Sequence, residues 1–504
     1  MICDWFNKWS LYCPEKTALT EVDSTTSFTY KQLNNGTNWL CHYFKDRHNL
    51  TKGDRILVLA DFHAEYVNLL GVAQKVGIII VPINFRLSAT EISFLVKNSD
   101  PSLIVVASHY KHLLSEVPYL AEHKLLEFEQ LQVLLQENCD EAYDFPAEEL
   151  EENHPAFILY TSGTTGKPKG AIYSHGMMLW NSLNTAIRLQ INSDDVNLNV
   201  MPPFHTGGWN VLTAPILHFG GTLIMMPKFE ADKVLQTLEK EKVSIFMAVP
   251  TMVRLMRESA VFEKIDFQRL RYMIVGGEAL PVSLIEDWSQ KEVLIRQGYG
   301  LTECGPNITS LEANDAIRKR GSIGFPNFYL QTKLVNESGI AVDKNEKGEL
   351  WIKGPIVTPG YWRNPEATEK AIVDGWFKTG DILLKDKEGY LYVVDRIKNM
   401  FISGGENVYP AEVEQCILKH ESVKEVCVVG VPDLKWGEVG KAIVVFKEAK
   451  TDISAIQNFC LQHLAKFKVP KYFEVMKELP KNDTGKIDRK LLSATDEVKS
   501  THLT

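Results

Sequence analysis

The chain has 504 residues, of which 45% are hydrophobic and 24% are charged, a composition that is ordinary for a soluble globular enzyme. Its 55 basic and 64 acidic residues give a net charge of −9, which argues against a nucleic acid as the main partner. The sequence has no run of about 18 apolar residues that could span a membrane, and its N-terminus lacks the pattern of a signal peptide. We therefore expect a cytoplasmic protein.

The eight cysteines show no Cys-x-x-Cys spacing and are not accompanied by a histidine cluster. We therefore expect reduced thiols rather than disulfides or a zinc site. The C-terminal tail from residue 466 onward is locally rich in lysine. A solvated face explains this most simply, and contact with an acidic phospholipid or a phosphorylated substrate is the alternative.

The first part of the chain alternates between strand and helix patterns. Strands are expected at residues 55–59, 78–81 and 103–107, and helices at 31–43, 64–76 and 89–97. Such alternation predicts a parallel, doubly wound sheet. Residues 112–153 are acidic and poorly periodic, so we expect a connecting or peripheral segment there.

The alternation resumes further along the chain. Strands are expected at residues 222–226, 244–249, 271–275 and 293–295, with helices at 231–240 and between the last two strands. Distinctive turns follow these last two strands, at residues 276–280 and 297–303. Because ligands of such sheets bind beyond the carboxyl ends of the strands, both turns are expected to face one crevice. Residues 320–395 have the short, glycine-bounded runs of an antiparallel β subdomain, and a small α+β domain follows residue 398.

Residues 160–170, Tyr-Thr-Ser-Gly-Thr-Thr-Gly-Lys-Pro-Lys-Gly, combine hydroxyls, glycines and lysines after an apolar strand pattern. Glycines let backbone N–H groups converge on an anion, while hydroxyls add donors and lysines add charge. The segment is not a Walker A loop, because Pro168 and Gly170 follow the two lysines and resist a helix at that point. It predicts a strand–loop–strand clasp for a polyphosphate; the alternative is a flexible surface loop.

Six motifs occur in order along nearly the whole chain. They are residues 160–170, Pro202-Pro-Phe-His-Thr-Gly-Gly208, Tyr299-Gly-Leu-Thr-Glu303, Gly375-Trp-Phe-Lys-Thr-Gly-Asp381, Asp395-Arg-Ile-Lys398 and Pro480-Lys-Asn-Asp-Thr-Gly-Lys486. Together they resemble the adenylate-forming superfamily, and Gly404-Gly-Glu-Asn-Val-Tyr-Pro-Ala-Glu412 is most similar to bacterial AMP-forming fatty acyl-CoA synthetases.

This resemblance implies an α/β fold in two parts. Residues 1–397 would form a large domain of doubly wound mixed sheets plus a β subdomain, with the ATP and acyl sites. Residues 398–504 would form a small, mobile α+β domain that carries the catalytic lysine. The implied reaction has two halves: a carboxylate attacks the α-phosphorus of ATP to give an acyl-adenylate and pyrophosphate, and the CoA thiol then displaces AMP.

The resemblance also assigns roles to the residues of the ATP site. Thr302 would contact the α-phosphate and Glu303 would ligate Mg²⁺, while Tyr299 would stack on adenine. Asp381 would accept the ribose hydroxyls and Arg396 would reach the ribose or a phosphate; a turn-closing aspartate and a surface arginine are the plainer interpretations. The β- and γ-phosphates would be cradled by Thr161, Ser162, Gly163, Thr164, Thr165, Gly166 and Lys169. The edge of the adenine would be lined by Gly276, Gly277 and Glu278.

The C-terminal motifs imply the remaining catalytic parts. Lys486 would bridge the attacking carboxylate and the α-phosphate in the first half-reaction. Because it would obstruct the thiol in the second, the family rotates the small domain, and Lys398 occupies the hinge position. Gly404 and Gly405 would line the pantetheine tunnel, where a side chain would clash.

The acyl pocket is the least specified part of the site. His205 borders the carboxylate site in relatives and is counted among the catalytic residues, while Trp209 either gates an acyl tunnel or is a core residue. The neighbouring residues are apolar and carry no charge that would select a charged acyl tail, so we expect a medium- or long-chain fatty acid.

The expected ligands are the fatty acid, ATP, CoA and Mg²⁺. The alternatives are an adenylating enzyme for an aryl or other acid or for a carrier-protein thiol, and a non-catalytic nucleotide-binding scaffold. Relatives of this type are often dimeric or peripheral to a membrane; both arrangements, including attachment at the inner face, stay open.

Overall fold

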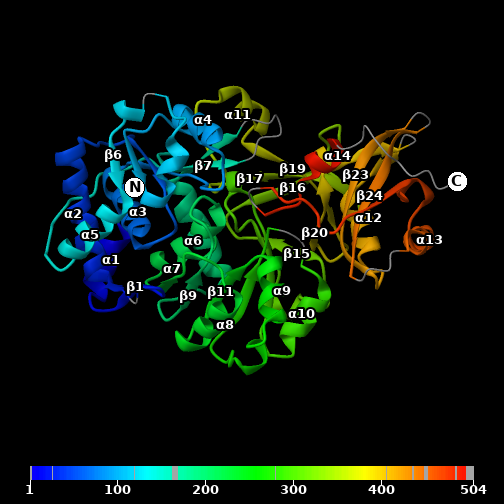
Figure 1. Cartoon of the computed structure of the whole chain (residues 1–504), viewed down its shortest axis with the longest axis horizontal. Helices are drawn as coiled ribbons and strands as arrows, with labels where there is room; N and C mark the ends of the chain where they lie inside the picture. Colours follow the sequence, from blue (N-terminus) through cyan, green and yellow to red (C-terminus); the bar gives the residue numbers. More distant parts are fainter. Residues whose placement is uncertain are drawn as a thin grey trace. The chain divides into compact units, whose positions relative to one another are not determined.

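A computed structural model of the chain describes residues 3–24, 26–118, 120–161, 168–277, 280–403, 406–433, 436–447, 452–482 and 485–494 (Figure 1). By its contacts the chain divides into two compact units. Unit 1 comprises Met1–Thr332 and Ile352–Phe377, and unit 2 comprises Lys333–Trp351 and Lys378–Thr504. Unit 2 therefore unites the C-terminal part with most of the β segment before it. The functional boundary between residues 397 and 398 stays a prediction.

The first sheet of unit 1 includes both ends of residues 160–170, the predicted polyphosphate segment. In the described residues its strands are, in spatial order, β6 (Leu125–Glu127), β5 (Leu103–Val106), β3 (Arg55–Leu59), β4 (Ile79–Pro82), β7 (Pro155–Thr161) and β8 (Lys169–Ser174). All neighbours are parallel except β7 and β8, which are antiparallel. Successive residues of β3 face opposite cores: Ile56 and Val58 join one hydrophobic cluster, and Leu57 joins another. Helices therefore cover both faces, as in a buried parallel sheet.

Amphipathic helices bury the two faces of this sheet. Leu33 of α2, Leu69 of α3 and Leu131 of α5 belong to the first cluster, and Ile92 of α4 belongs to the other. The helices of this half of unit 1 are α1 (Trp5–Tyr12), α2 (Tyr30–His48), α3 (Ala64–Val76), α4 (Ala89–Ser99), α5 (Phe128–Asn138) and α6 (His175–Leu189).

The second sheet of unit 1 follows the order β15-β14-β13-β12-β11-β9-β10-β1-β2. Its central strands are parallel, while β13, β14 and β15 pair antiparallel. The strands are β15 (Ser322–Pro326), β14 (Thr309–Ser310), β13 (Ile295–Tyr299), β12 (Tyr272–Val275), β11 (Ile245–Ala248), β9 (Val196–Asn199), β10 (Thr222–Met225), β1 (Thr17–Glu21) and β2 (Ser27–Thr29). Four helices accompany them: α7 (Thr213–His218), α8 (Ala231–Lys240), α9 (Pro250–Glu258) and α10 (Val282–Ser289). The segment Ile352–Phe377, which also belongs to unit 1, contains α11 (Pro365–Ala371) and β18 (Ile372–Val373).

Unit 2 contains most of an antiparallel β segment and a small α+β sheet. The β segment has the order β16 (Gln331–Val335), β17 (Lys347–Lys353), β19 (Trp376–Lys385) and β20 (Leu391–Arg396). The α+β sheet has the order β22 (Glu406–Val408), β21 (Phe401–Ser403), β24 (Gly437–Phe446) and β23 (Val423–Asp433), with β25 (Tyr472–Val475) beside β24. The helices are α12 (Pro410–Ile417), α13 (Ile453–His463) and α14 (Arg489–Ala494).

The mixed α/β fold confirms the predicted fold class, and two local predictions are wrong. Residues 112–153 are not merely a connection, because α5 buries Phe128, Leu131 and Leu135 in the core of unit 1. The strand expected at residues 293–295 instead begins at Ile295 and continues to Tyr299. The described part of the chain contains no helix that combines the length and apolar character needed to cross a membrane.

A buried ion pair fixes the N-terminal helix to the core of unit 1. Lys75 Nζ lies 2.5 Å from Asp4 Oδ2, and the two side chains are only 1% and 7% exposed. The other carboxylate oxygen of Asp4 accepts a hydrogen bond from Asn7 N at 3.2 Å and caps α1. Asp4 therefore links the start of α1 to the end of α3.

Asp4→Asn keeps a capping oxygen but leaves the buried ammonium of Lys75 without its counter-charge. We expect the free energy of unfolding to fall by about 3 kcal/mol, measured by urea denaturation, because an uncompensated buried charge is strongly destabilising. The matched control is the double variant Asp4→Asn/Lys75→Met, which should recover most of this loss. An equal loss in both variants would contradict the ion-pair explanation.

Candidate functional site

The polyphosphate segment is held by an antiparallel strand pair. Thr161 ends β7 and is paired with Lys169, which begins β8, so the chain leaves and re-enters the sheet at neighbouring positions. Thr161 Oγ1 also donates a hydrogen bond to Lys169 O at 3.4 Å. This is the strand–loop–strand arrangement expected from the sequence. The predicted loop residues Ser162, Gly163, Thr164, Thr165 and Gly166 lie outside the described residues.

A tyrosine that the sequence analysis did not single out contacts both Lys169 and Glu303. Tyr361 Oη donates a hydrogen bond of 3.0 Å to Glu303 Oε1, and Lys169 Nζ lies 5.4 Å from the centroid of the Tyr361 ring. Burial and the neighbouring Glu303 carboxylate raise the pKa of Tyr361 well above its ordinary value, so the hydroxyl stays protonated and can donate. The predicted phosphate and metal residues of unit 1 therefore share one partner.

Backbone hydrogen bonds hold Tyr361 in this position. Trp362 N donates to Gly170 O at 2.7 Å and Ile172 N donates to Gly360 O at 3.1 Å, so residues 360–362 pair with β8. On the other side, Thr358 N donates to Glu303 O at 2.7 Å. Thr302 and Glu303 lie in a short 3₁₀ turn directly before a buried cysteine.

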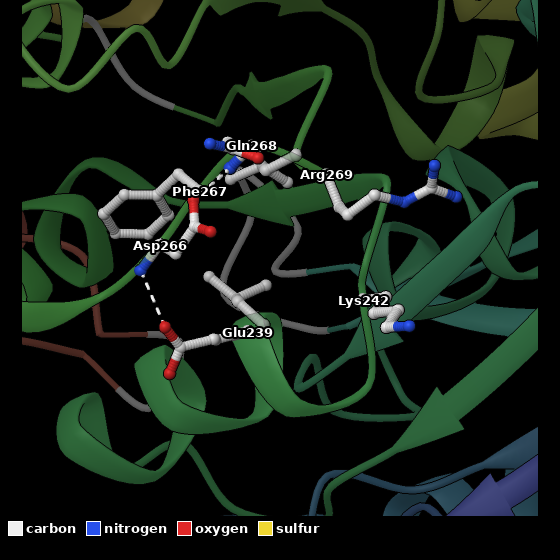
Figure 2. A pocket seen from close by; sticks show the side chains of 8 residues that line it. Glu239, Lys242, Asp266, Phe267, Gln268 and Arg269 are labelled. Carbon is white, nitrogen blue, oxygen red and sulfur yellow. Dashed lines mark hydrogen bonds between the residues drawn. The ribbon is translucent and has the colours of Figure 1, made fainter.

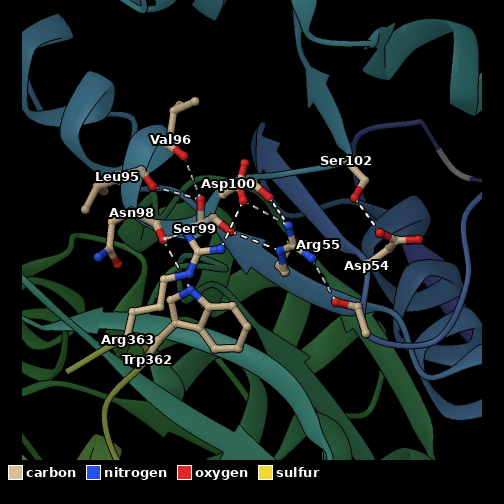
Figure 3. Close-up of polar contacts among 11 residues, drawn as sticks. Asp54, Arg55, Leu95, Val96, Asn98, Ser99, Asp100, Ser102, Trp362 and Arg363 are labelled. Atoms are coloured by element: carbon tan, nitrogen blue, oxygen red, sulfur yellow. Dashed lines mark hydrogen bonds and ion pairs between the residues drawn. The ribbon is translucent and has the colours of Figure 1, made fainter. Parts of the chain in front are cut away.

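The residues after Tyr361 are anchored at the C-terminal end of α4 (Figure 3). Trp362 Nε1 donates to Asn98 O at 3.2 Å, and an Arg363 guanidinium nitrogen lies 3.0 Å from Asp100 Oδ2. The Tyr160 hydroxyl donates to Asn98 Oδ1 at 2.6 Å. The end of α4 therefore holds both the strand before the polyphosphate loop and the segment that carries Tyr361.

The predicted adenine residues follow two neighbouring parallel strands. Gly276 and Gly277 come directly after β12, and Tyr299 is the last residue of β13. Tyr299 was predicted in a turn, and this is wrong because its pairing with Thr309 of β14 extends the strand. A Cβ on Gly276 would approach Gly298 O to 3.1 Å, so this position favours glycine. Glu278 lies outside the described residues.

The predicted ribose residues form an ion pair in unit 2. Asp381 and Arg396 are partners in the register of β19 and β20, and Arg396 Nε lies 2.9 Å from Asp381 Oδ1. The Asp381 side chain is 2% exposed, whereas that of Arg396 is 46% exposed. A buried carboxylate thus lies beneath an accessible guanidinium, an arrangement that suits a ligand with both hydroxyl and phosphate groups.

Lys486 is one of several charged groups that act on Lys398. The pKa of Lys398 is lowered overall, mainly by partial burial. The positive charges of Arg396, Lys490 and Lys486 also lower this pKa, whereas the carboxylate of Asp381 raises it. Lys486 is presented by a turn in which Asn482 N donates to Lys486 O at 2.7 Å and Lys486 N donates to Asn482 Oδ1 at 3.1 Å. The predicted tunnel residues Gly404 and Gly405 lie outside the described residues.

The predicted acyl segment is a tight turn in unit 1. Trp209 lies in a π-helical turn, Gly207–Val211, and is 0% exposed. Its Nε1 donates to Pro203 O at 2.8 Å, and its ring lies 4.4 Å from that of Phe62 between centroids. A Cβ on Gly208 would approach Pro202 O to 2.4 Å, so only glycine fits there. His205 is half-buried and lies two residues before this turn.

Buried asparagines that the sequence analysis did not single out surround the acyl segment. Asn181 Nδ2 donates to Asn210 O at 2.6 Å, and Asn307 Nδ2 donates to Val211 O at 3.1 Å. Within the described ranges, Asn181 Oδ1 and Asn210 Oδ1 are buried and have no hydrogen-bond partner. Asn181 lies inside α6 on a buried face, and a polar residue on such a face is the signal by which sequence reasoning could have found it.

The donor set near Glu303 fits magnesium bound with a phosphate ligand. In the part of the chain that the structure describes, no group of three or more His, Cys, Asp or Glu side chains could hold a metal ion. Magnesium does not need such a group, because it is usually bound by one or two carboxylates together with substrate phosphates and water. Glu303, close to Lys169, supplies one carboxylate of this kind.

A surface pocket elsewhere in unit 1 is not part of this site (Figure 2). Figure 2 shows Glu239, whose carboxylate accepts a hydrogen bond from Asp266 N at 2.8 Å, and Phe267, Gln268 and Arg269 around the opening. None of the residues that line this pocket is a predicted site residue.

Comparison with known proteins identifies the family. The model for "AMP-binding enzyme" matches residues 6–362, and the model for "AMP-binding enzyme C-terminal domain" matches residues 412–486. The chain therefore belongs to the AMP-binding enzyme family, within the adenylate-forming superfamily that includes acyl-CoA synthetases.

Similar proteins act on chemically different acids, to judge by their names. Feruloyl-CoA synthase of an Amycolatopsis species is 35% identical over 92% of this chain and 92% of the relative. Long-chain-fatty-acid–CoA ligase FadD13 of Mycobacterium tuberculosis is 36% identical over 95% of each chain. The solved structure of O-succinylbenzoate coenzyme A synthetase (MenE) from Bacillus subtilis, in complex with ATP and a magnesium ion, is 29% identical with a TM-score of 0.84, over 97% of this chain and 99% of that one.

The charges around Lys398 make a prediction about its titration. Lys490→Met should raise the pKa of Lys398 toward its ordinary value, because it removes a nearby cation. Asp381→Asn should lower the same pKa further, because it removes the carboxylate that favours the ammonium form. NMR titration of reductively ¹³C-methylated protein, assigned with Lys398→Arg, measures both shifts. Shifts of the same sign in the two variants would contradict this electrostatic explanation.

Proposed function

We propose that the protein is an ATP-dependent acyl-CoA ligase that forms AMP. In the first half-reaction a carboxylate oxygen forms a bond to the α-phosphorus of ATP and pyrophosphate leaves; in the second the CoA thiol displaces AMP and gives the thioester. The observation that carries this proposal is the joint contact of Tyr361 with Lys169 and Glu303, which gathers a cation and a carboxylate next to the polyphosphate segment. The family membership supports the same reaction.

The residues of unit 1 would bind and orient ATP. Thr161, Lys169 and the loop between them would hold the β- and γ-phosphates, Thr302 would contact the α-phosphate, and Tyr299 would stack on adenine. Bound through Glu303 and phosphate oxygens, Mg²⁺ would neutralise charge that develops on the phosphoryl group. The related MenE structure was solved with ATP and a magnesium ion, which supports these two ligands.

The residues of unit 2 would act on the ribose and the reacting centre. Asp381 would accept the ribose hydroxyls and Arg396 would reach the ribose or a phosphate. Lys486 would bring positive charge to the attacking carboxylate and the α-phosphate. Lys398 would be the hinge at which the backbone dihedral angles change between the half-reactions. The boundary between the large and the small domain would therefore lie at residue 398.

For the acid, we propose a medium- or long-chain fatty acid. The segment around Trp209 is apolar, with Leu212, Ile216 and Leu217 buried beside it. Among its described residues, no lysine, arginine, aspartate or glutamate would select a substrate with a charged tail. The similarity to the mycobacterial long-chain ligase supports this class. In this proposal His205 borders the carboxylate and Trp209 borders the chain.

A second class of acid is favoured by a specific observation. The carboxamide oxygens of Asn181 and Asn210 are buried beside the acyl segment and lack a partner within the described ranges. A buried acceptor without a partner costs free energy, and a hydroxyl group of an aryl or hydroxylated acid would supply the missing donor. The similarity to feruloyl-CoA synthase supports this alternative.

ATP–pyrophosphate exchange across a panel of acids tests the function and separates the two classes. The panel runs from acetate to palmitate and includes hydroxylated and unsubstituted aryl acids, with CoA added while AMP and thioester are followed. We expect exchange with fatty acids and thioester formation on addition of CoA. Preference for a hydroxylated aryl acid over its unsubstituted analogue would select the second class. Exchange without thioester would favour a carrier-protein thiol, and a folded protein that binds ATP without exchange would contradict the ligase.

Lys486→Ala should reduce adenylate formation at least 100-fold and leave thioester formation from supplied acyl-adenylate within about threefold of wild type. The reason is that the lysine would stabilise phosphoryl charge only in the first half-reaction, and loss of one such interaction typically costs about 10²–10³ in rate. Lys477→Ala removes an exposed lysine of the same basic tail and serves as the matched control. Equal loss of both half-reactions would contradict the role of Lys486.

A further inference from the structure

Tyr361 connects two functional residues that are far apart in the sequence. Its hydroxyl donates to Glu303 Oε1 at 3.0 Å, and its ring face lies 5.4 Å from Lys169 Nζ. The proposed function assigns Glu303 to Mg²⁺ and Lys169 to phosphate, but gives no role to the side chain between them. We propose that Tyr361 is a positioning residue that orients the Glu303 carboxylate for Mg²⁺ and the Lys169 ammonium for phosphate. This inference rests on the proposed function.

The hydrogen bond to one carboxylate oxygen restricts the rotation of Glu303. A glutamate side chain has several rotatable bonds and loses rotamer entropy when it must take up one geometry. Because Tyr361 Oη binds Oε1, the carboxylate is held in one orientation before the metal arrives. Outer partners of this kind tune metal affinity, and their loss typically costs about 10- to 100-fold.

The ring of Tyr361 acts on Lys169 through a different interaction. An ammonium over an aromatic face is attracted by the negative face of the ring. This attraction restrains the flexible lysine side chain through a neutral partner, so the interaction with Tyr361 leaves the positive charge of Lys169 in place for a phosphate. The hydroxyl and the ring can therefore be tested separately.

Tyr361 can position these groups because its own backbone is held from both sides. Residues 360–362 pair with β8 through Gly360 O and Trp362 N. Trp362 and Arg363 are held at Asn98 and Asp100 at the end of α4 (Figure 3). The side chain therefore extends from a fixed segment of backbone, which is the requirement for a positioning residue.

The decisive variant is Tyr361→Phe, which removes the hydroxyl and keeps the ring. Isothermal titration calorimetry of ATP, with and without Mg²⁺, should give a magnesium-dependent gain in affinity that is about 10-fold smaller than in wild type, with metal-free ATP binding unchanged. The Mg²⁺ concentration for half-maximal ATP–pyrophosphate exchange should rise by a similar factor. Tyr361→Leu should in addition weaken metal-free ATP binding, because it also removes the ring beneath Lys169.

Tyr30→Phe is the matched control for loss of one buried tyrosine hydroxyl, since Tyr30 Oη donates to Gly221 O at 2.7 Å in unit 1. It should lower the melting temperature without changing the magnesium dependence. A Tyr361→Phe protein with wild-type magnesium dependence would overturn the inference while leaving the ligase intact. Wild-type protein that binds no Mg²⁺–ATP would instead overturn the proposed function.

The double variant Tyr361→Phe/Glu303→Gln tests whether the tyrosine acts through the glutamate. If it does, Tyr361→Phe should reduce the magnesium-dependent gain in ATP affinity much less in a Glu303→Gln background than in the wild-type protein. Additive losses in affinity would overturn the positioning role, because they would mean that Tyr361 acts independently of Glu303.

Discussion

The pairing of β8 with two neighbours is the constraint on which the phosphate side of unit 1 depends. On one edge β8 pairs with β7, with Thr161 opposite Lys169; on the other edge it binds residues 360–362. Gly170 allows the close contact with β7, since a Cβ at this position would lie 2.6 Å from Ile158 Cγ2. Backbone hydrogen bonds thus set the separation of Lys169, Tyr361 and Glu303. Groups held in this way need little reorganisation when charge develops on a phosphate, which is the property that electrostatic catalysis requires.

Unit 2 differs in that it brings together cations that repel one another. Arg396, Lys486 and Lys490 all disfavour the charged form of Lys398, and Asp381 offsets only part of this effect. A bound phosphate would relieve the same repulsion, so the cost of gathering these cations in the free protein becomes affinity for an anion. The ion pair between Arg396 and Asp381 has a further consequence: if Asp381 accepts ribose hydroxyls as proposed, they would share its carboxylate with the guanidinium. In the proposed function, nucleotide binding would therefore be coupled to the charge balance of this unit.

The sequence predicted the parts of the site that local chemistry specifies. Pro168 and Gly170 resist a helix after the loop, which predicted a strand–loop–strand arrangement, and β8 begins at Lys169. The sequence did not point to Tyr361, because its partner Glu303 is 58 residues away in the chain. In addition, an aromatic residue in a connecting segment usually has a structural role. Tyr299 was misplaced because the glycines on both sides of it resemble a turn, whereas pairing with a distant strand, β14, extends β13 through it. Helix α5 was not predicted, because several glutamine and glutamate residues lie between its apolar residues and obscure the helical periodicity. For Tyr361 and Tyr299 the deciding contact is tertiary and leaves no local pattern.

The acyl side shows why the class of acid is harder to infer than the class of reaction. Trp209 cannot move easily to resize a pocket, because its indole N–H is bonded to Pro203 O and Gly208 beside it has no room for a side chain. A wall of this kind distinguishes acids by length only weakly, since one methylene is worth about 10- to 200-fold. Buried hydrogen-bonding groups discriminate by about 10⁴–10⁵ when a substrate leaves them unpaired. The carboxamide oxygens of Asn181 and Asn210 are buried and unpaired within the described ranges, so if an acid reached them, these two side chains would carry more of any strong selectivity than the tryptophan.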